Sequence, residues 1–421
     1  MTNIDASNDN VYDVIIVGGG PAGASTAIHL AAHGARVLLA EQKKFPRPKL
    51  CGEFISPECV AHFARLGVVE QMLAAGGVEV AETVFYTRGG QSVNVPSAWL
   101  GGTHRRVALG LSRATMDERL LSRARDVGVT VLEESPCCGL IIEQESVRGV
   151  RLKAAGVERA CRARVTVDAT GRSRALARRI ITAAAPHGER REHRTTRARP
   201  SLVAFKTHLE NTRGDQGACE IYFYRGGYGG LSEVEGGRSN LCFIAAARDV
   251  RARGGDAARV MREVVMSNKR AARTLGEARV CAEWLCVALE TFGRGEAVPQ
   301  TGLLAVGDAA SFIDPFTGSG MLMALESGEL AATRIARWLS GESTCTDKMP
   351  DMLARDYHAC YEEKFGARLR ACSRLRRAAF APSAIVEAGI AALNLSARAR
   401  RRLTRATRRT SQITSTELES G

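Results

Sequence analysis

Three glycines near the start of the chain have the spacing of a phosphate-binding turn. Gly18, Gly20 and Gly23 fit the pattern G-x-G-x-x-G, and Glu41 follows eighteen residues after the last of them. The first glycine makes a tight turn, the second lets the backbone approach a pyrophosphate, and the third lets a helix pack on a strand. Glu41 can accept hydrogen bonds from ribose hydroxyls. The spacing therefore predicts a site that holds a dinucleotide.

A second set of glycines and acids lies near residue 310. Gly307 and Asp308 end a run of apolar residues, and Gly318 and Gly320 precede a long helical pattern. A carboxylate at the end of a buried strand can accept hydrogen bonds from ribityl or ribose hydroxyls. The N-terminus of a helix carries partial positive charge, which suits a pyrophosphate or a flavin ring. This second set favours a flavin as the bound dinucleotide.

Together these motifs resemble those of FAD-dependent oxidoreductases of the aromatic-hydroxylase superfamily. Asp168-Ala169-Thr170-Gly171 is similar to their second FAD fingerprint, and Arg113 opens a predicted helix where they have an FAD-contacting arginine. The resemblance covers roughly residues 12 to 340. It implies that FAD is the cofactor. Because no second GxGxxG is found, it also implies that NADH or NADPH binds only transiently, as the reductant.

One segment resembles a particular branch of this superfamily. Pro46-Arg47-Pro48-Lys49-Leu50-Cys51-Gly52-Glu53 is similar to the Cys-Gly segment of geranylgeranyl reductases, which act on long prenyl chains. Their substrate-domain hairpin carries a Tyr-x-Trp-x-Phe-Pro motif, whereas this sequence reads Tyr228-Gly229-Gly230-Leu231-Ser232. Flavin-dependent halogenases carry Gly-Trp-x-Trp-x-Ile-Pro, and none of the three tryptophans has that setting, namely Trp99, Trp284 and Trp338.

The resemblance leaves two reactions open. Because the reductase hairpin motif is missing, we expect a monooxygenase that uses NAD(P)H and O2 to hydroxylate or epoxidise a hydrophobic small molecule, such as a prenylated aromatic of specialised metabolism. The alternative is a reductase of carbon–carbon double bonds in prenyl or lipid substrates. In both reactions the cofactor carries the chemistry, so no obligatory acid or base stands out and the catalytic residues stay undefined.

The thiols and histidines give no further site. Cys51 has two interpretations, a functional thiol beside the flavin or a small residue that closes a turn. The twelve cysteines form no CxxC pair and the eight histidines are scattered, so we expect no metal site. Five aromatic residues between 201 and 247 are either the substrate-pocket wall or core packing, namely Phe205, Tyr222, Phe223, Tyr224 and Phe243.

The elements that must position these residues follow from the apolar patterns. An apolar run at 14–17, a helical stretch at 24–33 and a strand at 36–40 form a βαβ unit around the first glycines. Strand-like segments at 202–207, 219–224 and 240–245 indicate an antiparallel sheet in the middle of the chain. A buried strand then returns at 303–308 and a long helix follows at 320–338.

These elements predict an α/β protein. We expect a Rossmann-like FAD-binding domain, an inserted substrate domain with a mainly antiparallel sheet, and a helical C-terminal tail, with the polar stretch 187–199 as a linker. The predicted ranges are 1–75, 101–186 and 290–345 for the first domain, 76–100 and 200–289 for the second, and 346–421 for the basic tail.

The net charge of +14 is concentrated in that tail. Between Lys364 and Arg409 there are thirteen basic residues and one acid, Glu387, which leaves the rest of the chain at about +2. A basic tail on a nearly neutral body does not indicate a nucleic-acid-binding fold. The tail is either solvated or lies weakly on an anionic membrane. With no apolar run of spanning length and a polar N-terminus, we expect a cytoplasmic protein, peripheral to the membrane in the second case.

Overall fold

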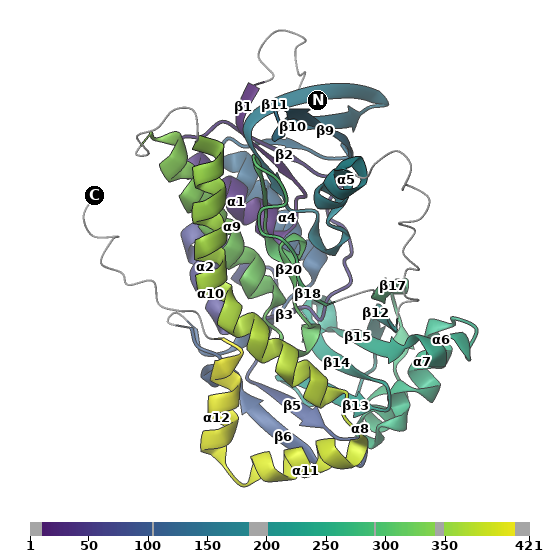
Figure 1. Ribbon diagram of the computed structural model, residues 1–421. Helices are drawn as coiled ribbons and strands as arrows, with labels where there is room; N and C mark the ends of the chain where they lie inside the picture. The colour runs from purple at the N-terminus through teal and green to yellow at the C-terminus, as the bar shows by residue number, and fades with distance from the viewer. Residues whose placement is uncertain (1–10, 103–104, 185–200, 290–291, 342–348, 409–421) are drawn as a thin grey trace.

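A computed structural model describes residues 11–102, 105–184, 201–289, 292–341 and 349–408 (Figure 1). It confirms the expected α/β architecture with a helical C-terminal region. The predicted linker at 187–199 lies outside the described residues, and the predicted domain boundaries stay predictions.

The first sheet contains the strand that leads into the glycine turn. β1 (Val11–Val17) lies between β2 (Val37–Ala40) and β11 (Val157–Asp168), and both pairs are parallel. The side chains at 14–17 are buried because helices cover the sheet, which explains the continuous apolar run. β8 (Thr130–Leu132) pairs in parallel with β2, and β19 (Leu303–Ala305) pairs in parallel with β11. β10 (Ser146–Ala154) pairs antiparallel with both β11 and β9 (Cys137–Glu143).

Two helices that start at predicted cofactor-binding turns pack against each other. α1 (Pro21–Ala32) follows the first glycine turn, and α9 (Gly320–Leu339) follows the second. α1 starts earlier than the predicted 24–33 because proline is well accommodated in the first helical turn. The helices approach closely, since a Cβ at Gly328 would lie 2.6 Å from the carbonyl oxygen of Ala22.

The second sheet comes from the middle of the chain and from two earlier strands. Its order is β16-β12-β15-β14-β13-β5-β6, and β13 and β5 form its one parallel pair among the described strands. The glycine-rich stretch from 226 forms the central strand β14, where a Cβ at Gly227 would lie 1.9 Å from the oxygen of Ile244. The strands are β5 (Glu82–Tyr86), β6 (Ser92–Pro96), β12 (Leu202–Glu210), β13 (Ala218–Tyr224), β14 (Gly227–Val234), β15 (Arg238–Ala246), β16 (Arg279–Val280) and β17 (Leu285–Leu289).

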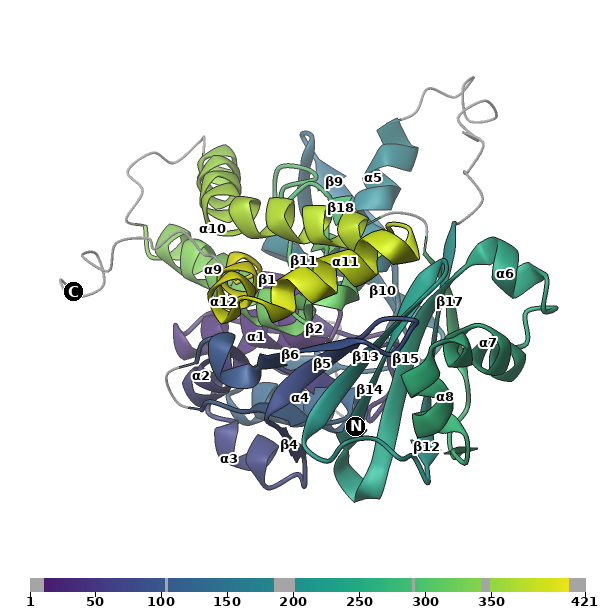
Figure 2. The ribbon, with the colours of Figure 1, turned by 90° about the horizontal axis from the view of Figure 1, so that it is seen from below.

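Three helices form the C-terminal region. α10 (Met349–Ala379) lies along α9, and α11 (Ser383–Asn394) and α12 (Ala397–Ala406) lie over β5 and β6 on the face seen in Figure 2. Within the described residues, no helix has the length and apolar character needed to span a membrane.

Shorter elements connect these layers. The helices are α2 (Pro57–Leu66), α3 (Val69–Leu73), α4 (Arg113–Asp126), α5 (Ala175–Ala184), α6 (Ala247–Arg251), α7 (Ala257–Glu263) and α8 (Lys269–Leu275). The strands are β3 (Phe54–Ile55), β4 (Val78–Val80), β7 (Ala108–Gly110), β18 (Gly293–Arg294) and β20 (Ser311–Phe312).

Candidate cofactor and substrate site

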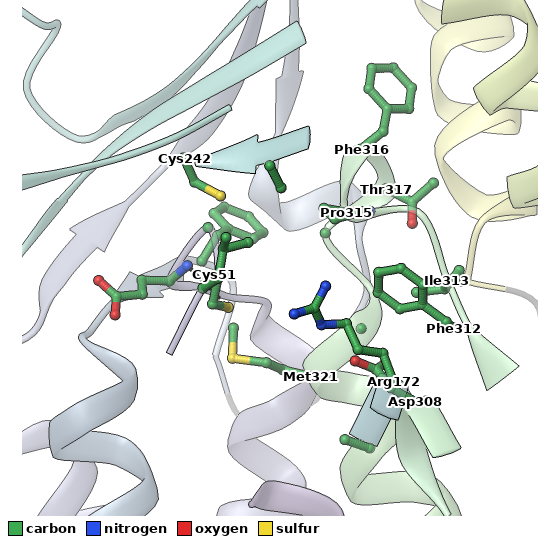
Figure 3. A pocket seen from close by; sticks show the side chains of 18 of the residues that line it. Cys51, Arg172, Cys242, Asp308, Phe312, Ile313, Pro315, Phe316, Thr317 and Met321 are labelled. Atoms are coloured by element: carbon green, nitrogen blue, oxygen red, sulfur yellow. Dashed lines mark hydrogen bonds between the residues drawn. The ribbon is translucent and has the colours of Figure 1, made fainter. Parts of the chain in front are cut away.

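A cavity of about 800 Å³ runs between the two sheets. Its walls come from the glycine turn after β1, the segment 47–54, the loop 306–321, one face of the second sheet, and helices α11 and α12. Figure 3 shows Cys51, Cys242 and Met321 grouped on one side of this cavity, with the guanidinium of Arg172 pointing into it beside Asp308. Predicted cofactor residues and apolar residues thus share one continuous space.

The glycine turn divides its roles as its spacing predicts. Gly18 has a φ of +114°, and a Cβ there would lie 2.3 Å from the oxygen of Ala169. Gly23 packs against the turn, since its Cβ would lie 1.9 Å from the oxygen of Gly18, and it does not line the cavity. Gly20 does line the cavity, and its Cβ would have no protein atom closer than 3.9 Å. The open space at Gly20 suits the close approach of a pyrophosphate.

Glu41 is 5% exposed and lies at the edge of the cavity. One carboxylate oxygen accepts the N–H of Gly19 at 2.9 Å, and the other accepts the N–H of Lys43 at 2.9 Å. Arg47 approaches the first oxygen at 3.5 Å. The carboxylate is therefore held against the glycine turn, with oxygen lone pairs left for ribose hydroxyls.

Arg113 opens α4 and lines the cavity, as predicted, but its guanidinium already has a partner. Its Nε and Nη2 both donate to the carboxylate of Asp117, at 2.7 Å each. Burial lowers the pKa of Arg113, but Asp117 more than offsets this effect, so the pKa is raised. Arg113 stays charged, with the rest of its N–H groups available to a ligand.

Asp168 departs from the prediction of a direct cofactor contact. It is fully buried, does not line the cavity, and uses its carboxylate within its own turn. One oxygen accepts the N–H of Thr170 at 3.0 Å and its hydroxyl at 2.6 Å, and the other accepts the N–H of Ala177 at 3.2 Å. Burial raises the pKa of Asp168. Asp168 thus holds Thr170 and Gly171 in the cavity wall, because an acid inside a tight turn satisfies nearby backbone donors.

The second predicted set lines the same cavity beside the start of α1, since a Cβ at Gly307 would lie 2.9 Å from Cβ of Ala22. Gly307, Asp308, Gly318 and Gly320 all line the cavity. Gly307 and Gly318 have φ of +58° and +59°, a region that favours glycine. Burial raises the pKa of Asp308 to about 6, although three cations oppose the shift, namely Arg113, Lys49 and Arg172. A carboxyl with such a costly charge is suited to a hydroxyl-bearing ligand that would stabilise it.

Three basic cavity residues were missed by the sequence analysis. Burial lowers the pKa of Lys49 and of Arg172, and Nε of Arg47 is buried with no described acceptor. Arg172 directly follows the Asp168 fingerprint, and Arg47 and Lys49 belong to the Cys-Gly segment, so proximity to known motifs was the available signal. Three cations that line the cavity, of which Arg47 also pairs with Glu41 and Asp117, fit an anionic ligand such as a dinucleotide pyrophosphate.

A buried charge network fixes the segment that carries Cys51. Glu53, 1% exposed, accepts hydrogen bonds from Nζ of Lys206, from Nε2 of His208 at 2.7 Å and from the N–H of Arg113 at 2.8 Å. Burial would raise the pKa of Glu53, but these donors lower it. Cys51 lines the cavity, and its Sγ accepts the N–H of Glu53 at 3.4 Å. The hydrogen bond agrees with a residue that closes a turn, and the position in the cavity wall keeps the interpretation as a functional thiol beside the flavin a prediction.

The apolar half of the cavity is bounded by aromatic rings. Phe316 lies in the loop before α9. The centroid of its ring is 5.6 Å from that of Phe85, 5.6 Å from that of Phe223 and 5.5 Å from that of Tyr228. These four residues line the cavity. Tyr228 also donates to the carboxylate of Asp314, which joins the second sheet to this loop.

Only one of the five aromatics considered for the pocket wall lies there. Phe223 lines the cavity, while the other four pack in the core on the opposite face of the sheet, namely Phe205, Tyr222, Tyr224 and Phe243. Successive side chains of a strand point to opposite faces, so Phe223 separates from its neighbours in β13. The same alternation places Cys242 and Ile244 of β15 in the cavity.

The match to a known protein family decides the cofactor class. Residues 11–346 match the family model described as FAD binding domain. The chain belongs to this family. It is therefore an FAD-dependent oxidoreductase, and the glycine turn, Glu41, Asp308 and the three cations of the cavity wall fit its cofactor. Among the described residues, no group of three or more His, Cys, Asp and Glu side chains is placed to hold a metal ion.

Individual relatives in this family have different names. The chain is 26% identical over 354 residues to a digeranylgeranylglycerophospholipid reductase of Methanosarcina mazei, covering 82% of this chain and 80% of the relative. It is 28% identical over 343 residues to a menaquinone reductase of Mycobacterium tuberculosis, covering 77% of each chain. The solved structure of the flavin-dependent brominase Bmp2 aligns with a TM-score of 0.72 at 21% identity, over 94% of this chain and 93% of that one. At that identity the brominase shows the fold alone.

Proposed function

We propose that this protein is an FAD-dependent reductase of carbon–carbon double bonds in a prenyl chain of a lipid substrate. The observation that carries this proposal is the similarity, over about four fifths of the chain, to relatives named as reductases of geranylgeranyl lipids and of menaquinone. The cavity supports it, because its apolar half continues directly from the predicted flavin site. These relatives favour the reductase over the monooxygenase expected from the sequence.

The chain's own residues would bind the cofactor in this cavity. Gly18 and Gly20 would admit the pyrophosphate, Glu41 and Asp308 would accept ribose and ribityl hydroxyls, and Arg113 would donate to it. Gly307 and Gly318 would give the second turn its left-handed backbone, Gly320 would leave room at the start of α9, and Gly23 and Asp168 would hold the turns in place. Each of these roles needs only the burial and open space described above.

The substrate half would orient the chain and exclude water. When bound and reduced, FAD supplies a hydride for one carbon of the double bond, with NADH or NADPH as the proposed source of that hydride. The other carbon needs a proton. The thiol of Cys51 faces the cavity and is fixed by Glu53 N–H and by Asn240, whose side chain donates to the Cys51 oxygen at 3.1 Å. Phe85, Phe223 and Phe316 would keep water away from the reacting carbons.

Monooxygenation is the second candidate, supported by the missing tryptophan motif in the hairpin of β13 and β14. One experiment separates the two. Holoprotein, NADPH or NADH, and a geranylgeranyl lipid in detergent are combined without oxygen. A reductase should oxidise the reduced flavin and give a product two hydrogen atoms heavier for each double bond. A product that forms only in air and gains an oxygen atom would instead establish the monooxygenase.

Replacing Cys51 by serine should slow double-bond reduction on the order of 100-fold, because a hydroxyl is a much weaker acid than a thiol. FAD content should not change, and turnover under steady-state conditions measures the effect. Cys242→Ser is the matched control, since burial raises the pKa of Cys242 to about 12 and makes that thiol a poor proton donor. Unchanged turnover in Cys51→Ser would show that Cys51 does not supply the proton to the second carbon.

FAD affinity should fall as the pH falls through about 6. Burial raises the pKa of Asp308 to about 6, so its carboxylate form, which accepts hydroxyl hydrogen bonds, is lost below that pH. We expect the FAD affinity to be about tenfold lower at pH 5 than at pH 8, because at one pH unit below its pKa only about a tenth of Asp308 is ionised. The stability of the apoprotein depends on pH in the opposite direction from its FAD affinity. The stabilising contribution of neutral Asp308 is present below its unfolded pKa of 3.8 and is lost as the pH rises through about 6.

Fluorescence titration of the apoprotein with FAD at several pH values measures this dependence. Asp308→Asn cannot ionise, so its FAD affinity should be weaker and flat over the same range. If the natural protein also showed a flat profile, the carboxylate of Asp308 would not be a ligand of FAD.

A further inference from the structure

Exposed apolar side chains gather at one place on this protein. Of eight large hydrophobic side chains that are exposed among the described residues, the two most exposed belong to α11 and the residue that follows it, Ile385 at 61% and Leu395 at 89%. Leu403 of α12 adds a third at 39%. Most other exposed positions of α11 are small and apolar, namely Ala384, Ala388, Gly389, Ala391 and Ala392, and Asn394 is the polar exception among the described exposed positions between Ile385 and Leu395. We call this surface of α11 and α12 the C-terminal patch.

Three polar residues of α11 and α12 contact the sheet beneath the helices. Asn394 donates to the oxygen of Ser92 at 2.8 Å, and Arg400 donates to Asn94 at 2.8 Å while lying 5.8 Å from the ring centre of Trp99. The acid Glu387 lies beside the β5–β6 turn, since a Cβ at Gly89 would be 3.2 Å from its carboxylate. The helices are thus held against β6 by polar contacts, and the exposed surface of α11 up to Gly389, Ala391 and Ala392 is apolar.

Four arginines flank this apolar face. Arg398, Arg401, Arg402 and Arg405 are exposed, and none of them pairs with an acid among the described residues. An apolar strip next to a row of cations complements an anionic lipid surface, where the strip enters the acyl boundary and the cations meet headgroups. A nucleic acid would match the charge but would leave the apolar strip in water.

The patch also surrounds the mouth of the cavity. Ile385, Gly389 and Leu403 line the cavity and are exposed to solvent at the same time. Behind them, Val386, Ile390 and Leu393 form the inner wall. Figure 2 shows α11 and α12 at the surface of the molecule, across the strands of the second sheet. A molecule that enters between these helices would pass from the patch into the apolar half of the cavity.

We propose that the C-terminal patch docks on an anionic lipid membrane and that a lipid substrate enters the cavity between α11 and α12. Delivery of a prenyl lipid rests on the proposed function, whereas docking does not. The helices lie on the membrane and do not cross it. Because each basic residue near an anionic leaflet strengthens binding about fivefold, four arginines account for an affinity difference of at least about 100-fold between anionic and neutral membranes.

Flotation of the holoprotein with vesicles tests the docking. The natural protein should float with vesicles of phosphatidylcholine containing one third phosphatidylglycerol and should stay unbound with phosphatidylcholine alone. Changing Arg398, Arg401, Arg402 and Arg405 to glutamine should weaken binding at least about 100-fold. The matched control removes four exposed arginines elsewhere, namely Arg119, Arg262, Arg273 and Arg355, and should bind as the natural protein does.

A second variant tests the apolar strip without touching charge or cavity. Leu395→Ser should weaken binding to the anionic vesicles severalfold, and far-UV circular dichroism should show unchanged helix content. Failure of the natural protein to bind anionic vesicles would overturn the proposal. So would equal losses in the patch and control variants, or a dimer in sedimentation velocity that Leu395→Ser abolishes, because the patch would then be a contact between copies.

Activity assays keep this proposal separate from the proposed function. With substrate in detergent, the arginine variant should retain the natural turnover. With substrate in anionic vesicles, it should lose most of it. Absence of reductase activity in detergent would contradict the proposed function and leave the flotation result to decide the docking alone.

Discussion

Replacing Gly20 by alanine should release FAD and leave the apoprotein as stable as before. The backbone at Gly20 has φ −73°, which any residue adopts, and an added methyl group would meet no protein atom closer than 3.9 Å. That methyl would occupy the space through which the glycine turn approaches a pyrophosphate. We expect FAD affinity to fall by at least about 100-fold, close to 3 kcal/mol.

Fluorescence titration with FAD and thermal unfolding of the apoprotein measure the two halves of this prediction. Gly23→Ala is the informative contrast, because a methyl there would lie 1.9 Å from the oxygen of Gly18. It should lower the melting temperature of the apoprotein, whereas Gly20→Ala should not. Tight FAD binding by a folded Gly20→Ala protein would place the pyrophosphate elsewhere in the cavity.

Replacing Arg368 by methionine should destabilise the protein by about 3 to 5 kcal/mol, because it leaves a buried carboxylate without its partner. Arg368 of α10 is 1% exposed, and its Nη1 donates to Glu326 of α9 at 2.5 Å. Its Nη2 also donates to the oxygen of Arg408 at 3.3 Å, so the end of the C-terminal region should loosen as well. Urea unfolding measures the loss.

Two further variants make this prediction specific. Changing Arg368 and Glu326 together to methionine should restore most of the stability, since no buried charge then remains unpaired. Arg65→Met breaks a bond of 2.7 Å to Glu329 on the same helix α9, but Arg65 is 48% exposed. Its cost should be below about 1 kcal/mol. If Arg65→Met and Arg368→Met lowered the free energy of unfolding by similar amounts, burial would not determine how much each ion pair contributes to stability.

The turns that line the cavity could be predicted because their signals are local. A tight turn, a close approach and a helix start each need particular residues at fixed spacing, so Gly18, Gly20 and Gly23 could be assigned roles from the sequence. Asp168 shows the limit of this method. Whether an acid at a strand end points toward a ligand or into its own turn depends on its side-chain rotamer, which spacing does not determine.

The substrate half could not be predicted, because both faces of the second sheet are apolar. One face packs on the short helices α6, α7 and α8, and the other faces the cavity. Alternation along β13 separates Tyr222 from Phe223, but it does not say which of the two faces the ligand. The tail shows a similar limit. A count of basic residues treats Arg368 and Arg401 alike, although the first is buried and the second exposed.

The length of α10 has a consequence for how the protein can move. α10 has 31 residues and is therefore about 46 Å long. Near its start Tyr357 donates to the oxygen of Ala305, at the end of β19, at 2.8 Å. Near its end Arg376 lies 3.4 Å from Asp314, and Phe380 packs on Tyr228 of the second sheet. α10 therefore contacts the first sheet near its start and the second sheet near its end.

A helix with contacts at both ends opposes hinge opening, because rotating one sheet away from the other would break the contacts at one end of α10. Exchange of a large substrate for product is then left to the short helix α11, whose displacement would uncover the cavity without disturbing the flavin side. Motions of single elements take microseconds to milliseconds. We therefore expect α11 to move on that timescale when substrate is exchanged for product, while α10 keeps the two sheets in place.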